Sequence, residues 1–225
     1  DRRAERLWEE SRAKAIVQDC DGQIGIVSEE TKPTTQLSPL LFDLTSLQRE
    51  ANSRFGFSAR TTLSLAQALY ERHKVLTYPR TDARALPEDY MPTVAATLET
   101  LKAKTLLAGA YAPFANQILK QGWVRPNKRI FDDKKISDHF AIIPTQQCPK
   151  NLNEAEAKIY DFVVRRFLAV FYPAAEYLQT TRITRVAEHP FKTEGKVLIN
   201  SGWLAVYGRS VAEETENLPA VSAAE

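Results

Sequence analysis

Residues 44–74 constrain the fold more than any other part of the chain, because they predict two short helices separated by Gly56. Thr45 is a good helix N-cap with Gln48 three residues later, and apolar residues follow at helical spacing. Ser58 is a second N-cap, and the helical spacing resumes after it. The outline is that of a helix-turn-helix, although any two helices joined by glycine give the same pattern.

The next segment, residues 76–82, places a phenol beside a guanidinium. Pro79 keeps the residue before it out of the α region, so Tyr78 should lie on an extended strand. Side chains alternate along extended backbone, so Tyr78 and Arg80 should point the same way. Tyrosine can act as a covalent nucleophile, and the planar arginine fork suits two phosphate oxygens, so the pair indicates a phosphoryl-transfer site. The same residues are also consistent with an ordinary strand that has a half-buried tyrosine and a surface arginine.

Both ends of the chain predict β structure beside one N-terminal helix. A charged helix should extend to about Val17, followed by a short strand near residues 24–27. Residues 31–39 contain two prolines with several Thr and Ser residues, which indicates a linker. Near the C-terminus, residues 178–188 and 194–207 are rich in β-branched and aromatic residues and predict strands.

The middle of the chain predicts further helices. Pro87 begins a third helix, which should run to about Leu107 with an interruption at Pro92. Residues 111–150 indicate a basic region rich in loops, and Asn153 caps a long amphipathic helix. We therefore expect an α+β fold in which a helical domain (40–173) is inserted into a small β-rich domain (1–39 and 174–225).

Composition excludes several classes of protein. With 44% hydrophobic residues the chain can bury a core, and it has no apolar run long enough to span a bilayer, so we expect no membrane partner. Cys20 and Cys148 are far apart and lack metal-ligand spacing, so we expect two reduced core thiols in a cytoplasmic protein.

The basic residues are unevenly distributed, although the net charge is only +2. Residues 45–85 contain seven Lys and Arg against three Asp and Glu, and residues 120–150 contain the same numbers, which leaves +4 in each stretch. Aromatic residues such as Trp123 and Phe140 lie near these charges. Cations and aromatic rings together suit single-stranded nucleic acid, although a solvated surface of mixed charge is equally consistent.

Several separate motifs, in the same order, resemble those of type IA DNA topoisomerases. They are Leu44 to Asn52, Arg54 to Ala59, Ala66 to Glu71, Thr77 to Asp82 and His139 to Thr145. The proline after the tyrosine is similar to the bacterial topoisomerase III branch. The resemblance covers most of the chain and implies the central part of a toroidal enzyme, an ATP-independent isomerase that relaxes and decatenates DNA.

The resemblance also implies roles for individual residues. Tyr78 would attack a phosphodiester of single-stranded DNA, which gives a 5′-phosphotyrosine and a free 3′-hydroxyl. Arg80 would position and neutralise that phosphate, and His139 would contact phosphate nearby. We expect further DNA contacts from Gln48, Arg49, Arg54, Ser58, Arg60, Thr81, Asp82, Lys134 and Lys135. Ala83 stands where the family pattern predicts serine, so a hydrogen bond from that hydroxyl is in question.

The family further implies Mg²⁺, bound by an acidic domain with a catalytic Glu and Lys. We find no comparable acidic domain in these 225 residues, so we expect no metal ligand here. The chain should then be one piece of a monomeric, nucleoid-associated bacterial topoisomerase, whose remaining domains are its partners. By itself this piece should bind DNA without relaxing it.

Two other classes remain open at this point. A non-enzymatic helix-turn-helix module explains the paired helices and basic stretches but gives the Tyr78 segment no purpose. A tyrosine recombinase uses the same nucleophile but needs several arginines and histidines, and it forms the opposite, 3′-linked adduct. The polarity of the adduct separates the two enzymes.

Overall fold

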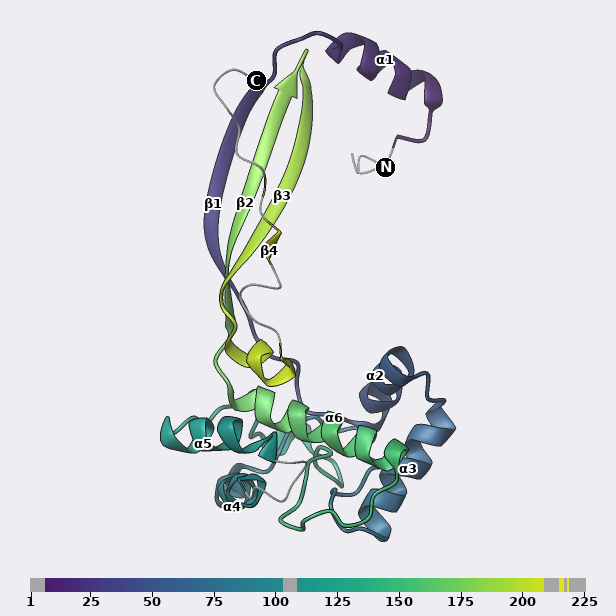
Figure 1. Cartoon of the computed structure of the whole chain (residues 1–225), viewed down its shortest axis with the longest axis vertical. Coiled ribbons are helices and arrows are strands. Elements are labelled where there is room, and N and C mark those ends of the chain that lie inside the picture. The colour runs from purple at the N-terminus through teal and green to yellow at the C-terminus, as the bar shows by residue number, and fades with distance from the viewer. Residues whose placement is uncertain (1–6, 103–108, 209–214, 217, 219–225) are drawn as a thin grey trace. The chain divides into compact units, whose positions relative to one another are not determined.

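The computed structural model describes residues 7–102, 109–208, 215–216 and 218, which form two compact units. Among the described residues, one unit comprises 7–36, 176–201, 215–216 and 218, and the other comprises 37–102, 109–175 and 202–208. The helical unit is inserted between parts of the sheet unit (Figure 1), which confirms the predicted fold class. Residues 202–209 group with the helices, and the proposed domain limits at 39/40 and 173/174 stay a prediction.

The sheet unit contains helix α1 (Glu10–Cys20) and four strands in the order β1-β2-β3-β4. The strands are β1 (Ile26–Gln36), β2 (Ala175–Val186), β3 (His189–Asn200) and β4 (Thr215–Glu216). β2 and β3 form an antiparallel hairpin in which Val186 pairs with His189. Its two loop residues, Ala187 and Glu188, have φ of 45° and 68°. Two positive φ values give the turn whose twist matches that of the flanking strands.

The linker predicted over residues 31–39 is wrong in its first part, because Thr31 to Gln36 belong to β1. β1 is an edge strand of the sheet. An edge strand tolerates Pro33, because the N–H groups on its outer side have no ladder partner to lose. Thr31 Oγ1 lies 2.9 Å from Thr180 Oγ1 on β2. Composition indicated a loop here because it does not show where a strand lies in a sheet.

The helical unit is built around α6 (Glu154–Phe171), most of whose residues are buried. It packs against α3 (Ala59–Glu71), α5 (Ala112–Lys120) and the 3-10 helix η4 (Gly202–Tyr207). The predicted cap of α6 is confirmed, since Asn153 Oδ1 accepts from the Glu156 N–H at 2.9 Å. The other elements are α2 (Leu44–Phe55), η1 (Glu88–Tyr90), α4 (Met91–Leu101) and η3 (Asp133–Lys135).

The pair α2 and α3 confirms the predicted helix, glycine turn and helix. Gly56 ends α2 with φ 71°, and Ser58 caps α3 by accepting from the Thr61 N–H at 3.0 Å. The predicted cap of α2 is wrong, because Asp43 occupies that position and accepts from the Ser46 N–H at 2.7 Å. Aspartate is as good an N-cap as threonine, so sequence alone did not separate the two.

The predicted third helix is wrong at its start. Pro87 precedes the short η1, and Pro92 lies in the first turn of α4 instead of interrupting a helix. Proline is tolerated there because the N–H groups of a first turn have no intrahelical acceptor. Residues 103–108, the predicted end of this helix, lie outside the described residues. Within the region predicted as loops, residues 112–120 form α5.

The strand predicted over residues 194–207 ends at Asn200, and Trp203 lies in η4. The N–H of Trp203 donates to the carbonyl of Pro173 at 3.1 Å. Gly202 has φ 47°, and a Cβ there would lie 2.4 Å from the carbonyl oxygen of Ala174. Only glycine permits this close return, which leads the chain back to α6.

The two cysteines are free, as predicted, but they are not core residues. Cys20 is half-buried, with its Sγ 3.6 Å from the carbonyl oxygen of Val186. Cys148 is exposed. The general tendency of free cysteines to be buried therefore does not hold at Cys148.

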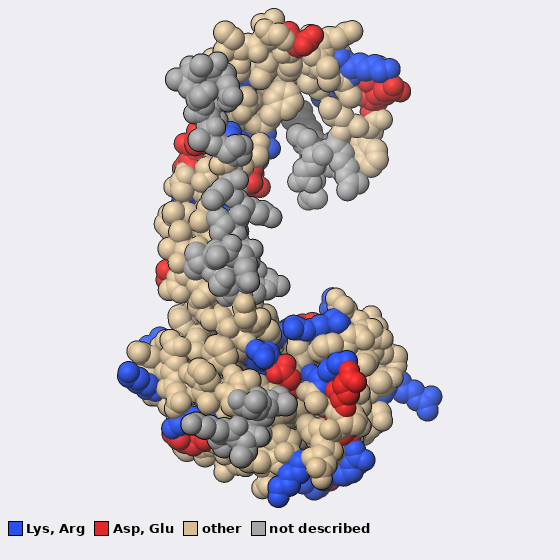
Figure 2. Space-filling model, viewed as in Figure 1, with Lys and Arg blue, Asp and Glu red and all other residues tan. Residues whose placement is uncertain are grey.

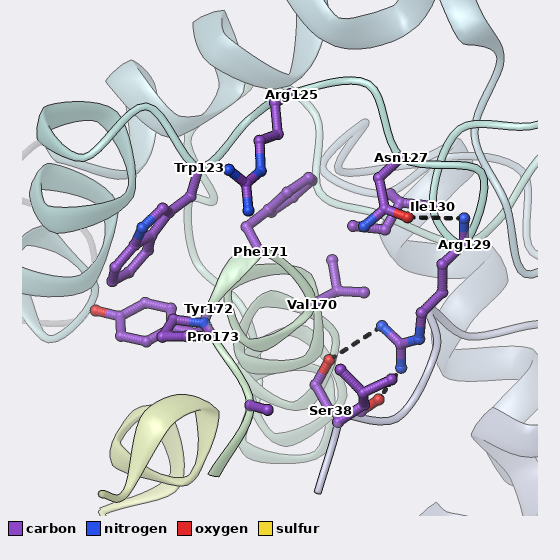
Figure 3. A pocket seen from close by; sticks show the side chains of 12 residues that line it. Ser38, Trp123, Arg125, Asn127, Arg129, Ile130, Val170, Phe171, Tyr172 and Pro173 are labelled. Atoms are coloured by element: carbon purple, nitrogen blue, oxygen red, sulfur yellow. Dashed lines mark hydrogen bonds between the residues drawn. The ribbon is translucent and has the colours of Figure 1, made fainter. Parts of the chain in front are cut away.

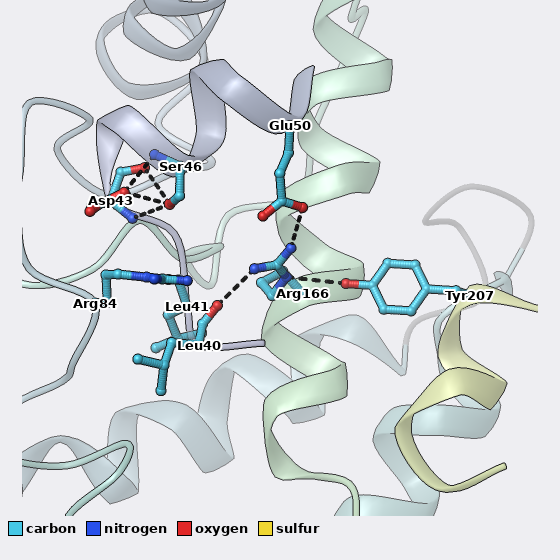
Figure 4. A network of polar contacts seen from close by, with 8 residues as sticks. All are labelled: Leu40, Leu41, Asp43, Ser46, Glu50, Arg84, Arg166 and Tyr207. Atoms are coloured by element: carbon cyan, nitrogen blue, oxygen red, sulfur yellow. Dashed lines mark hydrogen bonds and ion pairs between the residues drawn. The ribbon is translucent and has the colours of Figure 1, made fainter. Parts of the chain in front are cut away.

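Arg166 on α6 fixes the segment that leads into α2 (Figure 4). It is 3% exposed, and its Nη1 donates to the Leu40 carbonyl at 2.9 Å. Its Nη2 donates to Glu50 at 2.5 Å, and its Nε donates to the Tyr207 hydroxyl at 3.3 Å. The guanidinium also lies 4.0 Å from the ring centroid of Phe42. One buried cation thus joins α2, α6, η4 and the chain before α2.

Two further arginines bind the same segment. Arg84 Nε donates to the Leu41 carbonyl at 3.0 Å, and Arg129 donates to the Ser38 carbonyl. Burial, together with the positive charge of Arg84, lowers the pKa of Arg129. These carbonyls lie outside any helix or strand ladder, so side chains from distant parts of the chain provide their hydrogen bonds.

Candidate active site

The backbone around Tyr78 is held by the segment 141–145. The N–H of Thr77 donates to the Ile143 carbonyl at 3.0 Å, and the Thr77 hydroxyl donates to the Ala141 carbonyl at 3.0 Å. A single antiparallel bridge pairs Leu76 with Pro144. The bridge is limited to Leu76, and the chain around Tyr78 is not part of a regular strand. Pro79 contributes to this result because it has no N–H for a ladder.

Burial alternates along this segment as expected. Thr77 is half-buried and hydrogen-bonded on its inner side, and Pro79 and Thr81 are buried. Tyr78 is half-buried, and Arg80 is exposed. The Tyr78 phenol is thus partly accessible, and the Arg80 guanidinium is exposed, as is the nearby Asp82.

The ring of Tyr78 contacts two other rings. Tyr70 on α3 meets it nearly edge-on, with ring centroids 5.4 Å apart and planes at 78°. His139 lies closer, with centroids 4.3 Å apart and planes at 47°. Edge contacts of this kind fix the orientation of an aromatic ring. The structure therefore brings Tyr78 and His139 together, although 60 residues separate them in the chain.

Gln67 on α3 orients the guanidinium of Arg80. With its amide oxygen facing Arg80, Gln67 accepts from Nε and Nη2 at 3.1 Å each. Arginine has five N–H donors, so three remain for a ligand. A guanidinium held along one edge loses less side-chain entropy when its other edge grips a phosphate.

Thr81 connects the Tyr78 segment to the loop that carries His139. Its hydroxyl donates to the His139 carbonyl at 2.8 Å and accepts from the Ala83 N–H at 3.0 Å. Thr81 is 7% exposed and holds this loop, and its predicted DNA contact stays a prediction. Asp82 is exposed and accepts from the Ser137 hydroxyl at 3.3 Å. Ala83 is 3% exposed, so a serine hydroxyl there would be buried.

The remaining predicted DNA contacts occupy different environments. The Gln48 amide donates to the Ala59 carbonyl at 3.0 Å, and the Ser58 hydroxyl serves as a helix cap, so both have structural roles. The guanidinium of Arg54 lies 5.6 Å from the centroid of the Phe162 ring. Gln48 is half-buried, whereas the other residues of this group are exposed: Arg49, Arg54, Ser58, Arg60, Lys134 and Lys135.

Acidic residues partly neutralise the basic stretches. Lys135 pairs with Asp132 at 3.0 Å and, through that hydrogen bond and its charge, lowers the pKa of the Asp132 carboxyl. Lys128 pairs with Glu88, and Arg72 pairs with Glu156. On the face of the helical unit in Figure 2, Lys and Arg side chains are interspersed with acidic ones. Any DNA path on this face thus depends on individual cations more than on a continuous basic surface.

The described residues contain no cluster of side chains suited to a metal ion. Over residues 7–102, 109–208, 215–216 and 218, no group of three or more His, Cys, Asp or Glu side chains could hold a metal ion. The side chains around Tyr78 are phenols, an amide, an imidazole and a guanidinium, which do not form the oxygen-rich set that Mg²⁺ prefers. We therefore assign no step of a reaction to magnesium at residues of this chain.

Sequence reasoning missed Gln67 and Tyr70 as site residues. They are three positions apart on α3, so both face the Tyr78 segment. Their spacing on the helix directly before that segment is the signal that could have found them. The Lys74 ammonium lies 5.6 Å from the Tyr70 ring centroid and adds a positive charge beside the same rings.

We expect Gln67→Ala in the full-length protein to slow DNA cleavage about tenfold, equivalent to about 1.4 kcal/mol, because Arg80 loses its brace. Gln67→Glu, which keeps the acceptor, should retain more of the rate, and the exposed Ser64→Ala on α3 should leave it unchanged. Single-turnover cleavage of a labelled oligonucleotide measures the rates. Equal rates for Gln67→Ala and Ser64→Ala would remove Gln67 from the site.

The extended tyrosine–arginine segment, held against a helical pair and a histidine loop, matches a known class. The family model described as DNA topoisomerase matches residues 1–225, and the chain belongs to this family. A solved structure, topoisomerase I from Thermotoga maritima, has the same fold with a TM-score of 0.64 at 22% identity, covering 98% of this chain and 35% of that one.

Curated relatives identify the branch within this family. DNA topoisomerase 3 of Bacillus cereus is 45% identical over 205 residues, which are 90% of this chain and 27% of that protein. DNA topoisomerase 3 of Bacillus subtilis is 41% identical over 214 residues, 94% of this chain and 28% of that protein. The resemblance to topoisomerase III is thus confirmed over a chain that spans little more than a quarter of these relatives. The family is that of the DNA topoisomerases, and it is neither of the two other classes left open by the sequence, the tyrosine recombinase and the non-enzymatic helix-turn-helix module.

Proposed function

We propose that the full-length protein is a type IA topoisomerase and that Tyr78 is its nucleophile. The observation that carries this proposal is the Tyr78-Pro79-Arg80 segment, which presents a phenol held by two rings and a guanidinium braced by Gln67. The family membership of the chain supports it.

The proposed reaction exchanges one phosphodiester for another. The Tyr78 oxygen bonds to phosphorus, the bond from phosphorus to the 3′ oxygen breaks, and that oxygen leaves as a free 3′-hydroxyl. The phenol proton must depart and the 3′ oxygen must gain one, so a base and an acid are needed. Arg80 neutralises the phosphate, and His139 supports both the phosphate and the Tyr78 ring. One phosphodiester bond forms as another breaks, so the energy of the bond is retained in the adduct. Religation is therefore the reverse step and needs no ATP.

The proposal assigns the proton transfers and Mg²⁺ to other domains of the protein. Bound magnesium would neutralise phosphate charge near the nucleophile. The 225-residue chain by itself then binds DNA but does not relax supercoiled DNA, with or without magnesium. We place the whole protein in the bacterial cytoplasm as a monomer acting on nucleoid DNA, in relaxation and decatenation. Within the described part of the chain, no helix has the length and apolar character to cross a membrane.

The polarity of the covalent adduct tests the proposal. The full-length protein is mixed with magnesium and a single-stranded oligonucleotide labelled at either its 3′ or its 5′ end, then denatured. A 5′-phosphotyrosine carries the 3′ label with the protein and releases the 5′ label. An adduct that carries the 5′ label, or no adduct with any oligonucleotide, would contradict the proposed reaction.

We expect the 225-residue chain to bind single-stranded DNA more tightly than duplex of the same length. Its exposed cations are scattered among acidic side chains, which suits a flexible strand better than a rigid helix. Affinity should fall as salt rises, with a slope of about 0.7 for each phosphate neutralised. Fluorescence anisotropy with each DNA, at about 50 to 200 mM salt, measures the preference for single strands and the salt dependence of the affinity. Tighter binding of duplex, or affinity independent of salt, would count against this expectation.

A further inference from the structure

A cavity of about 320 Å³ lies in the helical unit, between the C-terminal end of α6 and the segment that follows α5 (Figure 3). Its walls include Trp123, Phe171 and Tyr172, together with Arg125 and Arg129. None of its lining residues belongs to the segments that form the Tyr78 site. It is therefore a separate feature that the proposed reaction does not use.

One wall of the cavity is aromatic. The rings of Trp123 and Tyr172 meet at 64° with centroids 4.8 Å apart. The Tyr172 hydroxyl donates to Gln117 Oε1 at 2.9 Å, and burial raises the pKa of Tyr172 to about 12, so the phenol is neutral at physiological pH. Trp123 is only half-buried, which leaves part of its indole surface accessible. Such a wall suits the face of a planar, apolar group.

Cationic side chains also line the cavity. Arg129 donates to Ser38, but Arg125 is exposed and makes no hydrogen bond or ion pair with any residue in the described part of the chain. In Figure 3 the guanidinium of Arg125 lies above Phe171, beside Trp123. No Asp or Glu is among the described residues that line the cavity. A free guanidinium without a nearby carboxylate favours an anion, and its planar fork suits phosphate.

We propose that this cavity binds one nucleotide of a DNA single strand, with the base against Trp123 and a phosphate on Arg125. The assignment rests on the proposed function, since it supplies a second contact for the strand that Tyr78 cleaves. The volume is at the lower end of the range of about 300–1,000 Å³ found for small-ligand sites, so it holds one nucleotide and excludes a duplex. Stacking of a base on an aromatic side chain is independent of sequence, as a topoisomerase substrate requires.

Photocrosslinking locates the contact. The full-length protein carrying Tyr78→Phe, which cannot form the adduct, is irradiated with an eight-residue oligothymidylate containing one 5-iodouracil. We expect mass spectrometry to find the cross-link on Trp123 or Tyr172. Because cleavage is not measured, failure here is distinct from failure of the proposed reaction. Cross-links confined to other peptides would overturn the proposed site. The same result is expected if another domain fills the cavity, and the cavity then binds no nucleotide.

Affinity measured on variants tests the aromatic and the cationic side chains separately. Arg125→Ala should weaken oligothymidylate binding about fivefold and reduce the salt slope by about 0.7 relative to Lys14→Ala, which removes one exposed charge from α1. Trp123→Ala should weaken binding at least fivefold, whereas Trp123→Phe, which preserves a stacking ring and the fold, should stay within about twofold. Equal affinity and slope for Arg125→Ala and Lys14→Ala would overturn the proposal. Thymidine monophosphate that binds as tightly as the oligonucleotide would overturn the assignment to a strand.

Discussion

Tyr78→Phe in the full-length protein should abolish the proposed covalent DNA adduct while leaving noncovalent DNA binding within about twofold. The substitution removes the one oxygen that bonds to phosphorus, and the remaining ring keeps its contacts with Tyr70 and His139. The adduct is measured on a denaturing gel with a 3′-labelled oligonucleotide, and binding is measured by anisotropy with the same strand. An adduct formed by Tyr78→Phe would show that another residue is the nucleophile.

Arg80→Lys provides the comparison. Lysine keeps the charge but loses the planar fork that Gln67 braces, so cleavage should be reduced by a few kcal/mol and not abolished. His139→Ala should fall between the two variants, because it removes a phosphate contact and a ring against Tyr78 but no bond-forming atom. Full activity of Arg80→Lys would mean that Arg80 contributes charge alone.

Arg166→Ala should lower the free energy of unfolding of the chain by about 3 kcal/mol. The substitution leaves the Leu40 carbonyl without its donor (Figure 4). It also removes a cation packed on the Phe42 ring. The loss of the pair with Glu50 adds little, because that carboxylate is 42% exposed and water can solvate it. Urea unfolding followed by circular dichroism measures the change.

Arg165→Ala is the matched control on the same helix. Arg165 is the next residue, but its side chain is 26% exposed and pairs with the partly exposed Asp161. Its loss should cost about 1 kcal/mol, most of it from the hydrogen bond to the Val206 carbonyl at 2.6 Å. If Arg166→Ala costs no more than Arg165→Ala, the buried contacts of Arg166 do not stabilise the segment before α2.

The elements that sequence predicted well are those set by neighbouring residues. Gly56 ends α2 because its own φ is positive, and Asn153 caps α6 through an amide three residues away. Pro79 makes Tyr78 extended through a clash between adjacent residues. Each of these outcomes depends on only a few residues of chain, so a local pattern was sufficient to identify it.

Tertiary structure alone decided the surroundings of those elements. Whether Pro33 interrupts a strand depends on that strand being at the edge of its sheet, which no local pattern contains. The burial of Thr81 and the three arginines that hold Ser38 to Leu41 likewise depend on segments far away in the chain. From the sequence, the geometry of extended backbone predicts that Tyr78 and Arg80 point the same way, and this stays a prediction. Only the packing of α3 and the His139 loop decided which groups orient them, because contacts between distant residues form when whole elements pack, and each element is compatible with many partners.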